Sequence, residues 1–166
     1  MQTYITSDNH FYHKNIIRYC NRPFSSVKHM NEYMVKKWND VVSYDDIVVH
    51  LGDFALTRNY TELKNIRNKL KGCIILIKGN HDNVRNLKKV GISVLSNSYF
   101  RIGNLLLSHR PFVEIRNNNL VNVHGHIHNK KTNGRRINVC VDVTEFKPVK
   151  IEKYFKQADK ILEESK

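Results

Sequence analysis

The sequence predicts a mixed α/β sandwich, and three observations support that prediction. In the first half of the chain, apolar runs short enough for buried strands alternate with segments of helical periodicity. The second half consists mostly of short strand-like runs and closes with an amphipathic segment. Polar motifs follow the ends of several of these runs, where open α/β sheets bind their ligands. The 166 residues contain no internal repeat or linker, so we expect one domain over residues 1–166.

Elements of the first half follow from apolar spacing and from glycines. Met30, Met34 and Trp38 recur at helical intervals and predict a long helix. Gly72 and Gly91 fit the C-terminal ends of two further helices. In chain order, we expect a strand at 2–6, helices at 14–20 and 27–43, a strand at 47–51, a helix at 60–70, a strand at 73–77 and a helix at 83–90.

The second half begins with a hairpin signal, because Gly103-Asn104 separates two short apolar runs. Later apolar runs predict further strands. The tail from Ile151 onward has apolar residues at helical spacing, which predicts an amphipathic helix. The expected strands of this half are 99–102, 105–107, 120–123 and 137–143.

The chain carries a formal net charge of +13, and its sequence pI is about 9.8. Such a charge favours phosphate-rich partners, including nucleotides and nucleic acid. The chain is also rich in Lys, Asn and Ile, the mixture that an AT-rich genome produces. The net charge alone therefore does not show whether the protein binds nucleic acid or only reflects the composition of its genome.

The N-terminal residues lack the basic and long apolar regions of a signal peptide. The longest apolar runs are also too short for a transmembrane helix. We therefore expect a cytoplasmic protein without a membrane partner. Cys20, Cys73 and Cys140 are odd in number and far apart, which favours buried, reduced thiols.

Five short motifs share one setting, because each follows an apolar run that we expect to be a strand. They are Asp8-Asn9-His10, Gly52-Asp53, Gly79-Asn80-His81-Asp82, Ser108-His109 and Gly125-His126-Ile127-His128. Strands of one sheet can bring such ends together. The gathered metal-ligand candidates would be Asp8, His10, Asp53, Asn80, His109, His126 and His128.

These candidate ligands are carboxylates, an amide and imidazoles, without a thiolate. The set disfavours a structural zinc site and suits Mn²⁺, Fe²⁺ or Zn²⁺. Seven ligands are too many for one ion that also binds water, but they suit two ions that share a carboxylate.

Each candidate also has a non-catalytic interpretation when it is considered alone. Asp8 or Asp82 could cap a helix, and Asn80 could form a turn. His126 and His128 would share one face of a strand, so a solvated sheet edge could explain both. These separate explanations do not account for a metal-competent side chain at every strand end.

The ordered set Asp-x-His, Gly-Asp, Gly-Asn-His-Asp, His and Gly-His-x-His resembles the calcineurin-like metallophosphoesterase family, from Asp8 to His128. The segment Asn21-Arg22-Pro23-Phe24 is similar to small phage and bacterial members. The resemblance implies a four-layer α/β/β/α sandwich of two mixed sheets flanked by helices. It also implies two divalent metal ions, with Mn²⁺ first and Fe²⁺, Zn²⁺ or Ni²⁺ as alternatives.

The resemblance further implies a role for each candidate ligand. Asp53 would bridge the two ions, and a metal-bound hydroxide would attack phosphorus in line with the leaving group. The ligands of the first ion would be Asp8, His10 and His128, and those of the second Asn80, His109 and His126.

His81 would be the general acid that protonates the leaving oxygen, and Asp82 would orient or polarise it. His13, Arg22 and Arg110 are candidate contacts to the substrate, since an arginine can hold a phosphate through two hydrogen bonds. Tyr12 stands where similar proteins often have a glycine, so it could narrow the mouth of the site or stack on a base.

The expected function is hydrolysis of phosphate esters, with phosphodiesters of nucleotide or nucleic-acid type favoured. One alternative is a phosphomonoesterase that uses the same site. Another is a nucleic-acid-binding module with weak catalysis, which the basic turn at residues 129–136 would serve. An HD-type phosphohydrolase would need its His-Asp pair on helices, and a metallo-β-lactamase-like site would need a His-x-His-x-Asp-His run that the sequence lacks.

Overall fold

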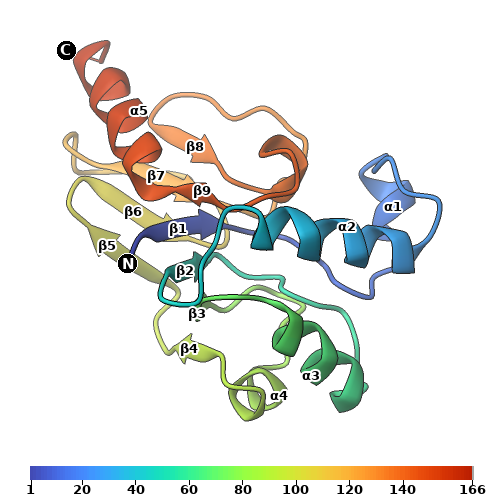
Figure 1. Cartoon of the computed structure of the whole chain (residues 1–166). Coiled ribbons are helices and arrows are strands. Elements are labelled where there is room, and N and C mark those ends of the chain that lie inside the picture. The colour runs from blue at the N-terminus through green and yellow to red at the C-terminus, as the bar shows by residue number, and fades with distance from the viewer. Residues whose placement is uncertain (166) are drawn as a thin grey trace.

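Two mixed β-sheets stack face to face in the computed structural model, which describes residues 1–165 (Figure 1). The first sheet has the order β4 (Ser93–Leu95), β3 (Cys73–Ile77), β2 (Ile47–His50), β1 (Thr3–Thr6) and β9 (Val149–Lys150). The second has the order β5 (Tyr99–Ile102), β6 (Leu105–Ser108), β7 (Val121–His124) and β8 (Arg136–Asn138). Only the β1–β9 and β5–β6 pairs are antiparallel. The predicted α/β fold of two mixed sheets flanked by helices is confirmed.

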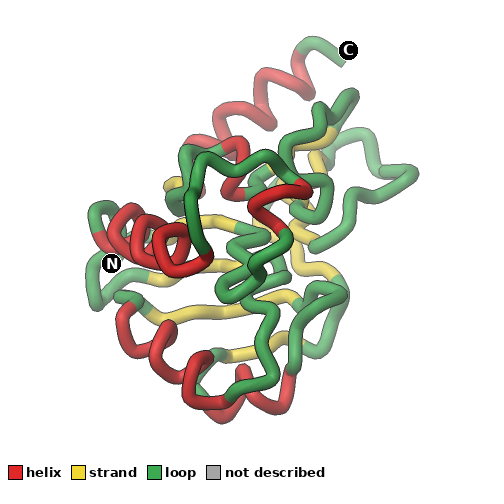
Figure 2. Tube along the Cα trace, turned by 90° about the vertical axis from the view of Figure 1, so that its right-hand side faces the viewer, coloured by secondary structure: helices red, strands yellow, loops and turns green. Residues whose placement is uncertain are grey.

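The carboxyl ends of the parallel strands meet at one side of the molecule. β1, β2 and β3 run parallel in the first sheet, and β6, β7 and β8 do so in the second. A bridge between Ser7 and Cys140 joins the segment after β1 to the segment after β8. Figure 2, which brings the right-hand side of Figure 1 forward, shows the loops that cross in front of the strands. The five polar motifs lie on these loops or at the strand ends that lead into them.

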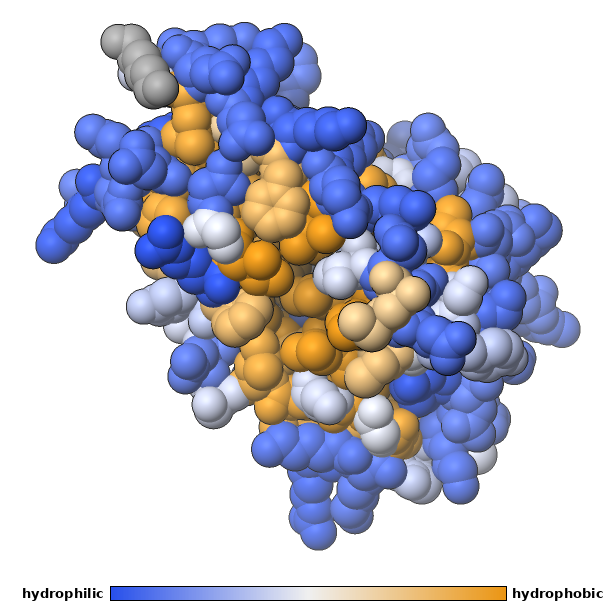
Figure 3. All heavy atoms as spheres, turned by 60° about the vertical axis from the view of Figure 1, so that its left-hand side comes forward, coloured by the Kyte–Doolittle hydropathy of each residue, from blue (hydrophilic) through white to orange (hydrophobic). Residues whose placement is uncertain are grey.

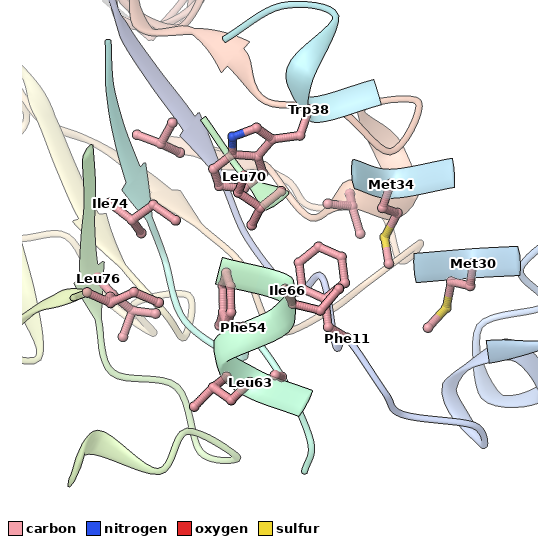
Figure 4. Packing of buried hydrophobic residues seen from close by; sticks show 14 of the residues in the cluster. Phe11, Met30, Met34, Trp38, Phe54, Leu63, Ile66, Leu70, Ile74 and Leu76 are labelled. Atoms are coloured by element: carbon pink, nitrogen blue, oxygen red, sulfur yellow. The ribbon is translucent and has the colours of Figure 1, made fainter. Parts of the chain in front are cut away.

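Helices cover the outer face of the first sheet and bury an apolar cluster there. Figure 4 shows Trp38 and Met34 in the same core as Ile66, Ile74 and Leu76. The apolar residues that recur at helical spacing in the sequence therefore face the sheet. Within residues 1–165, no helix has the length and apolar character needed to cross a lipid bilayer. The helices of this layer are α1 (Ile16–Tyr19), α2 (Val27–Asn39), α3 (Tyr60–Lys69) and α4 (Val84–Lys89).

A second apolar cluster fills the space between the sheets. Val49 and Ile77 of the first sheet share it with Leu107 and Val123 of the second. The C-terminal helix α5 (Ile151–Glu163) contacts β1, β6, β7 and β9 and adds its buried Ala158. Partly buried apolar side chains surround this cluster, and Figure 3 shows hydrophobic surface on the face that carries the left-hand side of Figure 1.

Several expected element boundaries were wrong, mainly where elements are short. The strand expected at 137–143 ends at Asn138, and Val141–Val143 forms a 3₁₀ turn. The Asn138 side chain accepts the backbone N–H of Cys140 at 3.0 Å and thereby turns the chain out of the sheet. β4 and β9 have three and two residues, too few to give a periodic signal. The helices expected at 14–20 and 27–43 are also shorter, as α1 and α2.

All three cysteines are free thiols. Cys20 and Cys140 are buried, as the sequence predicts. The prediction is wrong for Cys73, which is exposed. Cys73 begins β3, and burial on this strand starts only at Ile74.

Replacement of Ala158 by Leu tests how tightly α5 packs on the sheets. Ala158 is fully buried, so the larger side chain should lower the free energy of unfolding by about 1–3 kcal/mol. Urea unfolding followed by circular dichroism measures the change. Lys156→Leu puts the same side chain on the exposed face of α5 and should change stability by less than about 0.5 kcal/mol. Equal effects of both substitutions would contradict the packing of α5.

Candidate metal centre

The loops at the strand ends bring the predicted ligands into two neighbouring groups of three side chains. Within each group, the ligand atoms all lie within 4.8 Å of one another. One group is Asp8, His10 and His128, and the other is Asp53, His109 and His126. Asn80 lies beside the second group, because its Oδ1 atom is 3.0 Å from Nε2 of His109. The structure thus brings together all seven predicted ligands.

Five of these seven residues adopt the left-handed backbone conformation, with φ between 51° and 71°. Residues other than glycine rarely adopt it, although Asp and His do so more often than most. Such strain persists only where the surrounding structure enforces it, and it gathers at functional sites. The residues are Asp8, His10, Asp53, His126 and His128.

Two residues of the first group carry buried polar atoms without partners. Among the described residues, Asp8 Oδ1 and both ring nitrogens of His10 have no hydrogen-bond partner. The other oxygen, Asp8 Oδ2, accepts hydrogen bonds from the Ser7 hydroxyl and from the backbone N–H of His126. Burial alone would raise the pKa of Asp8, but the neighbouring imidazoles and the Ser7 hydroxyl outweigh it and lower that pKa. An ionised carboxylate beside unpartnered imidazole nitrogens is a donor set that fits a divalent cation.

Asp53 belongs to the second group but also lies close to the first. Its Oδ2 atom is 3.5 Å from Nε2 of His10 and 3.4 Å from Nε2 of His109. Its Oδ1 atom accepts the backbone N–H of His81 at 2.8 Å. One carboxylate oxygen is therefore directed at both groups, as a carboxylate shared by two ions requires.

Hydrogen bonds orient the histidine rings of both groups. Nδ1 of His109 is 2.8 Å from the carbonyl oxygen of Leu51, which leaves Nε2 to face the site. Nδ1 of His128 is 3.0 Å from Asp142 Oδ2. Burial would lower the pKa of His128, but the Asp142 carboxylate outweighs it and raises that pKa to about 10. Such outer partners fix the ring that a metal ligand presents.

Sequence reasoning missed Asp142 and assigned the wrong role to Arg22. The guanidinium of Arg22 is buried and pairs with Asp142, with Nε 2.8 Å from Oδ1. It also donates to the backbone carbonyls of Asp8 and Asn9, at 2.8 and 2.9 Å. Arg22 is therefore a buried support of the site and not a contact to substrate. Asp142 lay inside an expected strand, and its partner Arg22 is 120 residues away, so nothing local in the sequence indicated the pair.

The structure also corrects the expected role of Asp82. Its carboxylate accepts three backbone N–H groups, from Asp53 and Gly79 at 2.8 Å and from Phe54 at 2.9 Å. Among the described residues, no hydrogen bond joins it to the His81 side chain. Burial raises the pKa of Asp82, and these N–H donors oppose that rise. Asp82 ties the loop after β2 to the loop after β3 and does not orient His81.

The remaining candidates lie around the rim. The His13 ring is 5.3 Å from that of His10 and 6.3 Å from that of His81. Burial and the positive charges of neighbouring histidines lower the pKa of His13 to about 4. Arg110 is exposed beside His109. Tyr12 is half-buried against the cluster under the helices.

Two further histidines are fixed by hydrogen bonds outside the ligand groups. His50 is fully buried; its Nε2 is 2.9 Å from Asn9 Oδ1, and its Nδ1 accepts the N–H of Gly52. Burial lowers the pKa of His50 to about 3, so the ring is neutral. His124 Nδ1 is 2.9 Å from the carbonyl oxygen of Gly125.

A model of the calcineurin-like phosphoesterase family matches residues 1–165. The chain belongs to this family. An uncharacterized protein from Methanocaldococcus jannaschii is 38% identical over 167 residues, which is 95% of this chain and 91% of that relative. The crystal structure of a protein of unknown function from Aquifex aeolicus is similar, with a TM-score of 0.75 and 26% identity over 94% of this chain and 98% of that one. The family and the ligand groups together indicate a metal-binding phosphoesterase.

Replacement of Gly79 by Ala should weaken metal binding. A Cβ atom there would overlap the Asp53 carboxylate and the Asp53 backbone, and both would have to move. We expect Mn²⁺ affinity, measured by calorimetry, to fall about tenfold or more, as it does when partners of metal ligands are disturbed. At Gly91 a Cβ atom would meet nothing within 4 Å, but φ is 82°, so the control Gly91→Ala adds backbone strain away from the site and should lower stability while keeping the affinity. Wild-type affinity in Gly79→Ala would argue against Asp53 as a ligand.

Replacement of Asp82 by Asn tests whether this residue supports structure. The amide has one acceptor oxygen, so buried N–H groups lose a partner and the free energy of unfolding should fall by about 1–3 kcal/mol. Thermal and urea unfolding of the metal-free protein measure it. Asp45→Asn, which removes the same charge at an exposed site, should have little effect. Unchanged stability in Asp82→Asn would contradict the structural role and favour the catalytic role that the resemblance implies.

Proposed function

We propose that this protein is a phosphodiesterase that uses two divalent metal ions and acts on nucleotides or nucleic acid. The position of Asp53 Oδ2, within 3.5 Å of an imidazole nitrogen from each ligand group, is the observation that carries the proposal. Two ions that share a carboxylate are a common arrangement for in-line displacement at phosphorus. Oxygen and imidazole ligands favour Mn²⁺, with Fe²⁺, Zn²⁺ or Ni²⁺ as alternatives.

We assign three of the seven ligand residues to each ion and one to both. The ions would supply Lewis-acid chemistry, which lowers the pKa of the attacking water and neutralises charge on the phosphoryl oxygens. The protein holds both sets of ligands on loops that hydrogen bonds and buried ion pairs fix in advance. The first set is Asp8, His10 and His128, the second is Asn80, His109 and His126, and Asp53 is shared.

His81 is the residue we assign as general acid. Its backbone N–H donates to Asp53 at 2.8 Å, which fixes its position relative to the ligands. Its ring lies 5.4 Å from that of His10 and is exposed. Among the described residues, the His81 ring has no hydrogen-bond partner, so its nitrogens are free to donate a proton to a substrate. Histidine is the side chain that most often transfers protons in such reactions.

The net charge of +13 and the exposed cations beside the site support an anionic polymer or nucleotide as substrate. His13 and Arg110 remain our candidates for substrate contacts. A phosphomonoester could use the same metal ligands, but the open space beside His109 gives room for a second ester substituent.

The two arginines of the basic turn have a structural role, which weakens the case for this turn as a nucleic-acid contact. Arg135 donates to the carbonyl oxygens of Asn117 and Ile115, at 2.6 and 2.7 Å. Arg136 donates to those of Phe112 and Val113, at 2.7 and 2.6 Å. Both guanidinium groups are thus held by the loop of residues 110–120, whereas Lys130 and Lys131 of the same turn are exposed.

Activity and metal binding should separate between two variants. With Mn²⁺ and the dinucleotide thymidylyl-thymidine, whose alkoxide leaving group needs a proton, both His81→Ala and Asp53→Ala should lose about 100-fold or more of kcat. His81→Ala should still bind Mn²⁺, whereas Asp53→Ala should bind it weakly, as measured by calorimetry. His29, an exposed residue outside the site, provides the control variant His29→Ala, which should keep full activity. Full activity in either site variant, or no bound Mn²⁺ in the wild type, would refute the proposal.

A further inference from the structure

A cavity of about 470 Å³ lies next to the second ligand group. Asn80 and His109, both candidate ligands, form part of its wall. A phosphorus atom held between the two groups would therefore direct one of its ester substituents into this cavity. Its wall also includes Lys78, Ser108, Arg110 and Phe112.

Phe112 gives this cavity an aromatic wall. Its ring is half-buried and packs edge-on against Tyr99, with centroids 5.7 Å apart and planes at 80°. Tyr99 is at the start of β5 and supports the Phe112 ring from the side. An aromatic ring held in this way beside a phosphate site is a platform on which a base can stack.

Hydrogen bonds fix the backbone that carries this ring. The Ser108 hydroxyl donates to the carbonyl oxygen of Arg110 at 2.7 Å. The N–H of Phe112 donates to Asn122 Oδ1 at 2.8 Å, and its carbonyl oxygen accepts from Arg136 Nε at 2.7 Å. The wall is therefore formed before a ligand arrives, which reduces the entropy lost on binding.

Two cations on the cavity wall lack protein partners. Lys78 and Arg110 are exposed, and within residues 1–165 neither charged group forms an ion pair or a side-chain hydrogen bond. By contrast, Arg22 and Arg136 are fully engaged. Unpaired cations beside an aromatic side chain suit a ligand in which phosphate groups alternate with aromatic bases.

We propose that this cavity binds the nucleoside on one side of the scissile phosphodiester, with its base on Phe112. Arg110 and Lys78 hold the next phosphate along the strand. This assignment rests on the proposed function, because it takes the phosphodiester to lie between the two ligand groups. It makes a nucleotide strand, and not an aliphatic monoester, the substrate class of the site.

Binding of two simple probes to the Mn²⁺-loaded protein tests the base platform. Thymidine 5′-monophosphate and methyl phosphate carry the same charged group and differ only in the substituent. We expect calorimetry to give about tenfold tighter binding of the thymidine compound. Phe112→Ala should reduce this ratio to about one, with little effect on methyl phosphate, and Phe112→Leu should give an intermediate ratio. The control Phe100→Ala removes a ring that is 44% exposed on β5 and outside the cavity, and it should keep the ratio.

A second pair of probes tests the cations. Thymidine 3′,5′-bisphosphate should bind several-fold tighter than the monophosphate at moderate salt, because a second phosphate meets Arg110 and Lys78. Arg110→Ala should remove most of that gain. Arg116→Ala removes the same charge from the same loop at a side chain that is 90% exposed, and the gain should persist.

Equal binding of thymidine monophosphate and methyl phosphate would overturn the assignment. A preference for thymidine monophosphate that survives Phe112→Ala would also overturn it, and so would a failure of both probes to bind. Assays of diester hydrolysis separate this outcome from the proposed function. Hydrolysis without a base preference would refute the nucleoside cavity alone. A Phe112-dependent preference without any hydrolysis would refute the proposed catalysis alone.

Discussion

The geometry of the metal centre depends on the buried carboxylate of Asp82. It accepts the N–H groups of Asp53 and Gly79 at 2.8 Å and so binds the loop after β2 to the loop after β3. Asp53 adds a second link between the same two loops, because it accepts the N–H of His81. Buried N–H groups need acceptors, and here the acceptor comes from the neighbouring loop, so neither loop can move alone. This cross-connection holds Asp53 Oδ2 between His10 and His109.

Close packing and backbone strain add to this constraint. Gly125 is so close to Ser7 and Asp8 that a side chain there would overlap them. Asp8 and His10 hold left-handed backbone conformations, and their N–H groups donate to the carbonyl oxygens of Gly52 and Asp53 at 3.0 Å. The folded structure therefore holds the candidate ligand atoms close together. Without it, these atoms would repel one another or remain solvated. The paired Arg22 and Asp142 extend the same support to His128.

Sequence reasoning singled out the residues of the two groups because their signal is local. Each motif, such as Gly79-Asn80-His81-Asp82, directly follows an apolar strand, and parallel strands place such ends at one edge. It did not find Asp142, and it misassigned Arg22 and Asp82, because what these side chains contact is set by distant parts of the chain. The two-residue strand β9 and the turn Val141–Val143 were missed for a related reason, since tertiary hydrogen bonds and not periodicity define them.

The sequence by itself determined the α/β class, the succession of the main strands along the chain and the chemistry of the seven ligand candidates. Periodicity and residue type are local properties, so they can be recognised without the fold. The tertiary structure decided how close these side chains come to one another, including the position of Asp53 Oδ2 near both His10 and His109. It also decided which charged groups are occupied by the protein and which, such as Arg110, remain free for a ligand. A residue's partners depend on distances between segments far apart in the chain, and only packing of the two sheets fixes those distances.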